Sequence, residues 1–414
     1  MDAVRRVAIV GRGVEDGLAA TVLLAMAALP VLEIAARAIL GAGIPGAIAT
    51  VQNLTLWIAM LGALIASREG RHLGLSTAML HMPPALGACA GAFAAAVSAA
   101  VAAGLFWAGL QFVLAETASP TQIGGWLPIW VAEAILPVGF AIIALKFVVL
   151  ADGWRRRVVA GLGIPAAAAI GFALPAEGAA LAPFAIAGLA AAALLGAPIF
   201  VVLGGAALLL FFADGVPVAA ISVETYRLVA SPSISAIPLF TLTGYLLAEG
   251  GASRRLVRLF RALFAWMPGG MVAAATLVCA FFTTFTGASG VTILALGGLL
   301  LPALVENGYR KRFSLGLLTA TGSIGLLFPP SLAVILYAVV AHVSILDLFV
   351  AGIVPGMIMV AAICLFGLRE GLRHSTPRPR FEAREAVAAL WQSKWELLLP
   401  VVLLAGIFGG ITTL

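Results

Sequence analysis

The chain has 414 residues, of which 63% are hydrophobic and only 10% are charged. A water-soluble domain carries about a quarter of charged residues, so this composition excludes a soluble protein and predicts one embedded in a lipid bilayer. The formal net charge of +6 comes from basic residues in short clusters, which orient membrane helices, and we therefore expect no nucleic acid partner.

Long uncharged runs define the expected helices. The runs without Asp, Glu, Lys or Arg are residues 38–67, 73–115, 158–176, 178–213, 262–305, 313–346, 348–368 and 397–414. Most of them reach the roughly 18 to 20 apolar residues that cross the hydrocarbon core. They lack the short alternating pattern of a membrane barrel, and lipid admits only helices and closed barrels. The sequence therefore predicts an all-α, polytopic membrane helical bundle surrounded by lipid.

Basic loops predict the orientation of the N-terminal part. Arg5, Arg6 and Arg12 precede the first span, and residues 68–72 and 155–157 form two further basic clusters. Basic loops remain in the cytoplasm, so we expect a cytoplasmic N-terminus and four spans.

The same pattern predicts how the chain is divided. Residues 1–157 would form a four-helix membrane unit, residues 158–177 a connecting helix, and residues 178–414 a second, larger unit. The run 178–213 is interrupted by Gly-Ala-Pro at 196–198. The sequence leaves open whether this run folds as two short helices or whether residues 214–230 do not lie flat on the membrane surface.

Residues 262–305 lie between two basic clusters that should both be cytoplasmic. The sequence TTFTGASG at 283–290 interrupts this run and leaves arms of about 15 residues, or roughly 22 Å at 1.5 Å per residue. Because the hydrocarbon core is about 30 Å thick, we expect a re-entrant helical hairpin that turns near the middle of the membrane.

The run 313–346 contains Pro329-Pro330 near its middle. Proline donates no backbone hydrogen bond and ends a helix, so we expect a broken span. Irregular backbone at membrane depth is tolerated only where it is buried in protein or lines a cavity. Two such interruptions close in sequence are typical of a transporter binding site.

Oxygen atoms, not carboxylates, are the groups available at these interruptions. The candidates are Thr286, Ser289, Thr292, Gly325 and Ser331. Hydroxyl and carbonyl oxygens suit a dehydrated sodium ion, and helix N-termini beside them would favour an anionic substrate group.

Two other functions are compatible with parts of the sequence. GASG at 287–290 matches the GxSG pattern of intramembrane serine proteases, in which Ser289 would need a histidine as base, and His342 is the candidate. A membrane scaffold or channel subunit without transport activity is the other alternative.

Three smaller features complete the expectations. Glu33 and Arg37 are four residues apart and predict an ion pair that faces a neighbouring helix. Residues 382–395 mix charges with Ala, Val, Leu and Trp, which predicts an amphipathic helix on the membrane surface. The three cysteines lie far apart in apolar runs, which indicates neither a disulfide framework nor a zinc site.

An ordered set of motifs resembles the large membrane subunit of tripartite ATP-independent periplasmic (TRAP) transporters. The set consists of AIPLF at 236–240, Gly244, RRL at 254–256, PGG at 268–270, GASG at 287–290, GY at 308–309, Gly322, Gly325, FPPS at 328–331 and GGIT at 409–412. Residues 1–157 resemble the small four-helix subunit of the same family through Arg37 and the loop at 68–72.

The resemblance implies an elevator-type carrier, not an enzyme, in the bacterial cytoplasmic (inner) membrane. Such a carrier receives an organic acid anion from an extracytoplasmic solute-binding protein and imports it with sodium as the coupling ion. The family also implies a second inverted half with its own hairpin and broken helix. Because the chain ends before that half, we expect a truncated or split large subunit.

Motif and resemblance together predict the site. The expected sodium ligands are Thr286, Gly287, Ser289, Gly290, Gly325 and Pro329. The expected substrate-binding residues are Ser289, Thr292 and Ser331.

Overall fold

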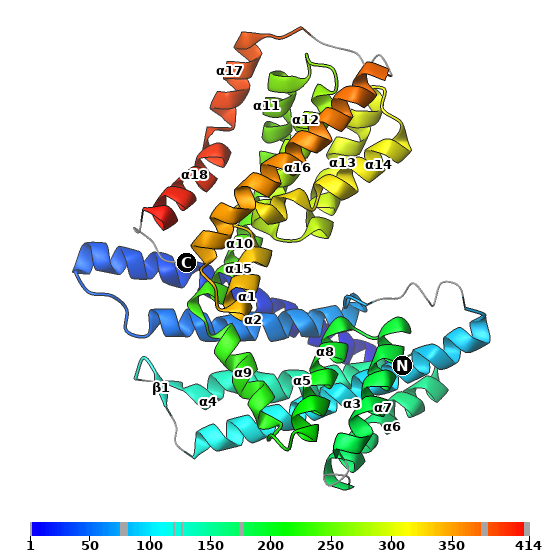
Figure 1. Ribbon diagram of the computed structural model, residues 1–414. Helices are drawn as coiled ribbons and strands as arrows, with labels where there is room; N and C mark the ends of the chain where they lie inside the picture. The colour runs from blue at the N-terminus through cyan, green and yellow to red at the C-terminus, as the bar shows by residue number, and fades with distance from the viewer. Residues whose placement is uncertain are drawn as a thin grey trace. The chain divides into compact units, whose positions relative to one another are not determined.

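A computed structural model describes residues 2–74, 82–118, 121–125, 127–151, 153–173, 178–373 and 380–409. Across these residues the regular secondary structure is helical, apart from one antiparallel hairpin of β1 (Gln122–Ile123) and β2 (Leu127–Pro128) and an isolated bridge between Gly74 and Pro198 (Figure 1). Six helices are long and apolar enough to cross a membrane, and up to nine spans result if each of three bent helix pairs counts as one. The prediction of an all-α, polytopic membrane protein is confirmed.

Two compact units, residues 1–231 and 232–414, make up the chain. The first unit contains α1 (Asp2–Leu40), α2 (Ala47–Glu69), α3 (Pro84–Thr117), α4 (Ile129–Glu133), α5 (Ile135–Val149), α6 (Trp154–Ala173), α7 (Gly178–Leu194), α8 (Ile199–Ala213) and α9 (Ala219–Val229). Its first four apolar spans are Gly11–Leu40, Ala47–Glu69, Leu86–Thr117 and Ile129–Val149, as the sequence predicts.

Helix α3 is the centre of the first unit and packs against α5, α6, α8 and α9. Gly109 on α3 lies against Pro137, and a Cβ atom at Gly109 would lie 3.1 Å from the proline nitrogen. Such small residues allow membrane helices to approach closely. The run 178–213 forms two short helices, α7 and α8, which resolves the alternative that the sequence left open.

Charged residues gather where the N-terminal half of α1 meets the C-terminal ends of α2 and α5. Arg68 donates to Glu15 at 3.2 Å and to Asp16 at 2.8 Å, and Lys146 donates to Glu15 and to the carbonyl of Leu64. The four groups therefore fix the ends of three helices to one another.

Removing Arg68 should loosen this end of the unit. We expect Arg68→Met to lower the free energy of unfolding by about 1.5–3 kcal/mol, because it breaks hydrogen bonds between charged, partly buried groups. Arg71 is a matched control, since its side chain is 81% exposed against 15% for Arg68, and Arg71→Met should change stability by less than about 0.5 kcal/mol. Thermal unfolding of the purified chain in detergent compares the two, and equal effects would contradict the network.

The ion pair between Glu33 and Arg37 is present, with a nitrogen–oxygen distance of 2.9 Å. Its surroundings differ from the prediction. Arg37 is largely exposed, and the buried Glu33 accepts a hydrogen bond from the backbone N–H of Ile44 in the loop between α1 and α2. The expectation of a pair facing a neighbouring helix is wrong, because the short loop brings an unpaired backbone donor to the carboxylate.

His72 lies in the loop after α2 and contacts the start of α8 and the C-terminal end of α5. Its ring centroid is 5.0 Å from that of Phe200 and 6.0 Å from that of Phe147, and the next residue, Leu73, accepts a hydrogen bond from the N–H of Ile199. Burial among these side chains lowers the pKa of His72.

The lowered pKa of His72 predicts a pH dependence of this contact. As the pH falls below the ordinary histidine pKa of about 6.5, the unfolded chain binds a proton at His72 more readily than the folded chain does. The contact should therefore have its full stability above that pH and lose stability as the pH falls. We expect the amide of Ile199, corrected for its intrinsic exchange rate, to exchange hydrogen faster at about pH 5.5 than at about pH 7.5. In His72→Gln the difference should disappear, and its persistence would rule out His72 as the cause.

The second unit contains α10 (Pro232–Glu249), α11 (Ala252–Phe264), α12 (Gly270–Thr286), α13 (Ser289–Glu306), α14 (Lys311–Thr321), the 3-10 turn η2 (Ile324–Leu327), α15 (Leu332–Ala341), α16 (Ile345–Arg373), α17 (Ala383–Gln392) and α18 (Lys394–Phe408). Helix α12 is its centre and packs against α10, α11, α13, α14 and α16.

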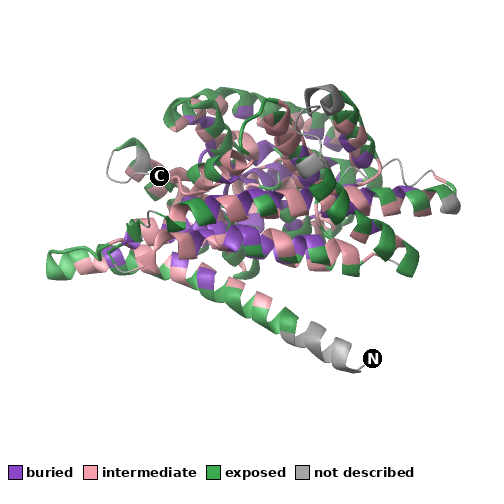
Figure 2. Ribbon diagram, turned by 90° about the horizontal axis from the view of Figure 1, so that it is seen from below, coloured by how far each residue is buried: buried purple, intermediate pink, exposed green. Residues whose placement is uncertain are grey.

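The burial pattern in Figure 2 shows the expected arrangement, with buried residues inside the helical packing and exposed ones on outward faces. Residues 410–412 of the GGIT motif lie outside the described residues.

The amphipathic helix predicted at 382–395 is present as α17, which bends by 59° into α18. Ala386 and Ala389 are buried, whereas Val387 and Trp391 are largely exposed. Its polar side contacts α11, where the guanidinium of Arg258 donates to the carboxylate of Glu385. That its apolar side lies on a membrane surface stays a prediction.

Candidate functional site

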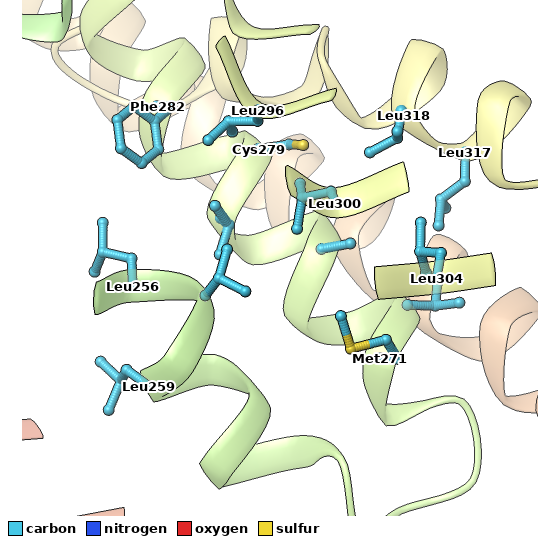
Figure 3. Close-up of a cluster of buried hydrophobic side chains, with 14 of the residues drawn as sticks. Leu256, Leu259, Met271, Cys279, Phe282, Leu296, Leu300, Leu304, Leu317 and Leu318 are labelled. Carbon is cyan, nitrogen blue, oxygen red and sulfur yellow. The ribbon is translucent and has the colours of Figure 1, made fainter. Parts of the chain in front are cut away.

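Helices α12 and α13 form an antiparallel hairpin. In the close-up of their shared core, Leu304 lies beside Met271 near the open end, and Leu296 lies beside Cys279 toward the tip (Figure 3). The two arms have 17 and 18 residues. The helical hairpin is therefore confirmed, while its re-entrant position in the membrane stays a prediction.

Gly287 makes the turn at the hairpin tip. Its φ angle is 64°, in the left-handed region that glycine occupies without steric cost. A Cβ atom at this position would lie 2.6 Å from the Cβ of Leu332, the first residue of α15. The tip thus packs directly against the start of the second half of the broken helix.

The broken helix is interrupted over a longer stretch than the sequence predicts. Helix α14 ends at Thr321, η2 follows, and α15 begins at Leu332, with a bend of 48° between the two halves. The irregular backbone therefore starts at Gly322, before Pro329-Pro330. The reason is close packing, because a Cβ atom at Gly325 would lie 2.6 Å from the Cβ of Thr283 and 2.8 Å from the backbone nitrogen of Thr284.

Three buried threonines join the hairpin to the broken helix. Thr283 and Thr292 are 0% exposed and Thr286 is 3% exposed. The Oγ1 atom of Thr292 lies 2.9 Å from that of Thr283 and 2.9 Å from that of Thr286. The Oγ1 atom of Thr283 also lies 3.0 Å from the carbonyl oxygen of Gly322. We call Thr283, Thr286 and Thr292 the threonine cluster.

Around the threonine cluster, the oxygen atoms that can accept a hydrogen bond outnumber the hydroxyl protons that can be donated. The hydroxyl of Thr283 has one proton but lies within 3.0 Å of the Cys279 carbonyl, the Gly322 carbonyl and the Thr292 hydroxyl. The Thr292 hydroxyl likewise faces two hydroxyls and, at 3.4 Å, the carbonyl of Ala288. Such an arrangement of lone pairs, without a carboxylate among these contacts, can bind a small cation.

Ser331 adds an unsatisfied group at the other side of the interruption. It is 0% exposed and occupies the N-cap position of α15 without a side-chain capping hydrogen bond, and its hydroxyl oxygen has no hydrogen-bond partner among the described residues. The N-terminus of a helix carries partial positive charge and free N–H groups, so this end of α15 is suited to an anionic group.

The predicted site residues do not all lie together. Thr286 and Thr292 belong to the threonine cluster, and the Gly325 carbonyl lies 3.3 Å from the hydroxyl of Thr284. Ser289 is half-buried at the start of α13, and Gly290 is exposed. Gly287 forms the turn, and Pro329 is buried in the interruption.

Thr283 was not predicted from the sequence. It stands four residues before Gly287, and Thr292 stands four residues after Ala288. Residues equally distant from the turn of an antiparallel hairpin face each other, so this symmetry could have identified the pair.

The protease alternative is wrong. The hairpin tip contacts Leu332 at the start of α15, whereas His342 follows the last residue of that ten-residue helix. At 1.5 Å per residue the histidine is roughly 15 Å away along the helix, too far to activate Ser289. Among the described residues there is also no group of three or more His, Cys, Asp or Glu that could hold a metal ion.

Two protein families match separate parts of the chain. Residues 186–414 match the family described as "Tripartite ATP-independent periplasmic transporter, DctM component", and residues 26–158 match the "DctQ component" of the same transporters. The chain belongs to the TRAP transporter permeases and joins the small and the large permease part in one polypeptide.

Curated relatives give the same result. The isethionate TRAP transporter permease protein DctMQ of Oleidesulfovibrio alaskensis is 33% identical over 324 residues, which is 76% of this chain and 51% of the relative. The C4-dicarboxylate large permease protein DctM of Vibrio cholerae is 30% identical over 53% of this chain and 49% of its own length. The ectoine/5-hydroxyectoine large permease protein UehC of Ruegeria pomeroyi is 30% identical over 43% of this chain and 42% of its own length. The chain spans about half the length of the relatives it matches, and their names identify transporter permeases, not enzymes.

Proposed function

We propose that the chain is the permease component of a sodium-coupled secondary transporter that imports an organic acid anion delivered by an extracytoplasmic solute-binding protein. Membership of the TRAP permeases supports transport across the inner membrane with such a partner. The observation that carries the sodium coupling is the threonine cluster, which connects the hairpin tip to the broken helix through the Gly322 carbonyl.

Sodium fits the chemistry of the cluster. Hydroxyl and carbonyl oxygens are the ligands that hard cations prefer, and the shared hydroxyl protons leave lone pairs free on Thr283 and Thr292. A bound ion would hold α12, α13 and the segment at Gly322 in one arrangement. The predicted ligands Ser289 and Gly290 lie at the tip. They would coordinate the sodium ion only if the tip moves toward the interruption of the broken helix.

The substrate anion would bind where two helices begin. Helix α13 starts at Ser289, and α15 starts after Ser331, whose hydroxyl is free to donate a hydrogen bond. Thr292 is fully buried in the threonine cluster, so we assign it to sodium and not to the substrate. The names of the relatives include isethionate, C4-dicarboxylate and ectoine transporters, and the proposal is limited to organic acid anions.

Uptake by cells that produce the full chain tests this function. A panel of labelled organic acids, including C4-dicarboxylates and isethionate, is offered with a cognate solute-binding protein in sodium or choline medium. We expect uptake that needs both sodium and the binding protein. Equal uptake in choline would refute sodium coupling, and uptake without the binding protein would refute that partnership.

A further inference from the structure

Glu133 is a buried carboxyl group to which the described part of the chain offers no counter-charge. It ends α4 inside the apolar span Ile129–Val149, and only 2% of its surface is exposed. Its Oε2 atom is buried and has no hydrogen-bond partner among the described residues, and none of their lysine, arginine or histidine side chains forms an ion pair with it. An ionised carboxylate alone in apolar surroundings is strongly disfavoured, so this group requires a neutralising partner.

Uncharged oxygen atoms lie on the helices around Glu133. On α2, the indole N–H of Trp57 donates to the carbonyl of Ala132 at 2.9 Å, which places this face of α2 beside the end of α4. One turn earlier on α2, the side-chain oxygen of the buried Asn53 accepts a hydrogen bond of 3.2 Å from the hydroxyl of Tyr226 on α9. The Glu133 carboxyl group lies within electrostatic reach of the Tyr226 phenol. Two oxygen atoms from two helices are thus available near the carboxyl group.

Charged groups on the packed elements do not supply the missing charge. On α3, the half-buried Glu116 is itself an acidic side chain and cannot supply a positive charge. On α5, Lys146 is 13 residues beyond Glu133, roughly 20 Å along a helix, and donates to a glutamate of α1. On α9, Arg227 pairs with a glutamate of its own helix. Among the described residues, no charged side chain on these elements therefore neutralises Glu133.

We propose that Glu133 binds one monovalent cation, a proton or a sodium ion, beside Asn53 and Tyr226. The site lies at a boundary within the first unit: Asn53 and Glu133 belong to the residues that match the DctQ component, and Tyr226 belongs to those that match the DctM component. The bound cation neutralises the carboxylate beside the contact between α9 and α2. This site is separate from the threonine cluster and does not depend on it.

Infrared spectroscopy of the purified full chain identifies the cation. At about pH 7.5 an exposed glutamate is ionised, so a protonated-carboxyl band arises only from buried groups. Spectra are recorded in sodium chloride and in choline chloride for the wild type, Glu133→Gln and the control Glu116→Gln. If the cation is a proton, the wild type shows the band in both salts. If it is sodium, the band appears only in choline, because a proton replaces the lost ion.

In both cases the band should vanish in Glu133→Gln and remain in Glu116→Gln. Should Glu133→Gln not fold, Glu133→Asp, which shifts the band, takes its place. A wild-type spectrum without a Glu133-dependent band in either salt would overturn the proposal, because the carboxylate would then be ionised without sodium. Thr292→Val should retain the band. The spectra therefore test Glu133 independently of whether the threonine cluster binds sodium.

Discussion

Replacing Gly325 by alanine should abolish sodium-dependent uptake and destabilise the second unit. A Cβ atom at this position would overlap the carbonyl oxygen of Ala280 and would lie 2.6 Å from the Cβ of Thr283 and 2.8 Å from the backbone nitrogen of Thr284. Backbone atoms of α12 cannot move aside without shifting the threonine cluster. Overpacking of a core costs about 1–3 kcal/mol, and we expect Gly325→Ala to lie at the upper end of that range.

Gly298 offers the matched control for Gly325. It lies in the middle of α13, and a Cβ atom at this position would meet open space, with no heavy atom of another described segment within 4 Å. Because alanine favours helix over glycine by about 1 kcal/mol, Gly298→Ala should keep or raise thermal stability and leave uptake unchanged. Thermal unfolding and uptake are measured for both variants. Wild-type uptake by Gly325→Ala would show that the close contact between η2 and α12 is not needed.

Thr292→Val should weaken sodium binding at least tenfold. The substitution keeps the shape of the side chain but removes the hydroxyl that faces both Thr283 and Thr286. A tenfold change corresponds to about 1.4 kcal/mol. The buried hydroxyl of Thr286 also loses a partner, which should lower the free energy of unfolding by about 1–3 kcal/mol. Sodium titrations of the unfolding temperature, at constant ionic strength with choline, measure both effects.

Thr276→Val is the control that distinguishes weaker sodium binding from the general effect of removing a buried hydroxyl group. Thr276 is also 0% exposed and lies on α12, but its hydroxyl donates within the helix, to the carbonyl of Val272 at 2.8 Å. We expect its sodium dependence to equal that of the wild type. If both variants lose the sodium response to the same extent, the effect belongs to helix α12 in general and not to the threonine cluster.

Helices that are long and uncharged could be predicted from the sequence. The four spans of the first unit, the hairpin at Gly287 and the amphipathic helix α17 all follow from hydropathy, charge and glycine position. These features depend on local sequence, since a long apolar run must form its hydrogen bonds internally in lipid.

Features that depend on packing between distant segments were predicted less well. The interruption of the broken helix begins at Gly322, well before the two prolines, because Gly325 approaches the backbone of α12. Thr283 belongs to the candidate site because the pairing of the two hairpin arms brings it to Thr292. Glu33 binds a loop amide, whose position the sequence does not determine. In each case the deciding contact is formed by tertiary structure, and only the pairing of Thr283 with Thr292 has a signal in the sequence, namely their equal distance from the hairpin turn.

Equilibrium binding of radioactive sodium to the purified full chain tests the central claim most directly. We predict saturable binding that Thr292→Val weakens at least tenfold, by about 1.4 kcal/mol, and that Thr276→Val leaves unchanged. The component lost in Thr292→Val should persist in Glu133→Gln, because the two sites are separate. No saturable binding, or binding of equal strength in Thr292→Val and the wild type, would contradict sodium coordination by the threonine cluster.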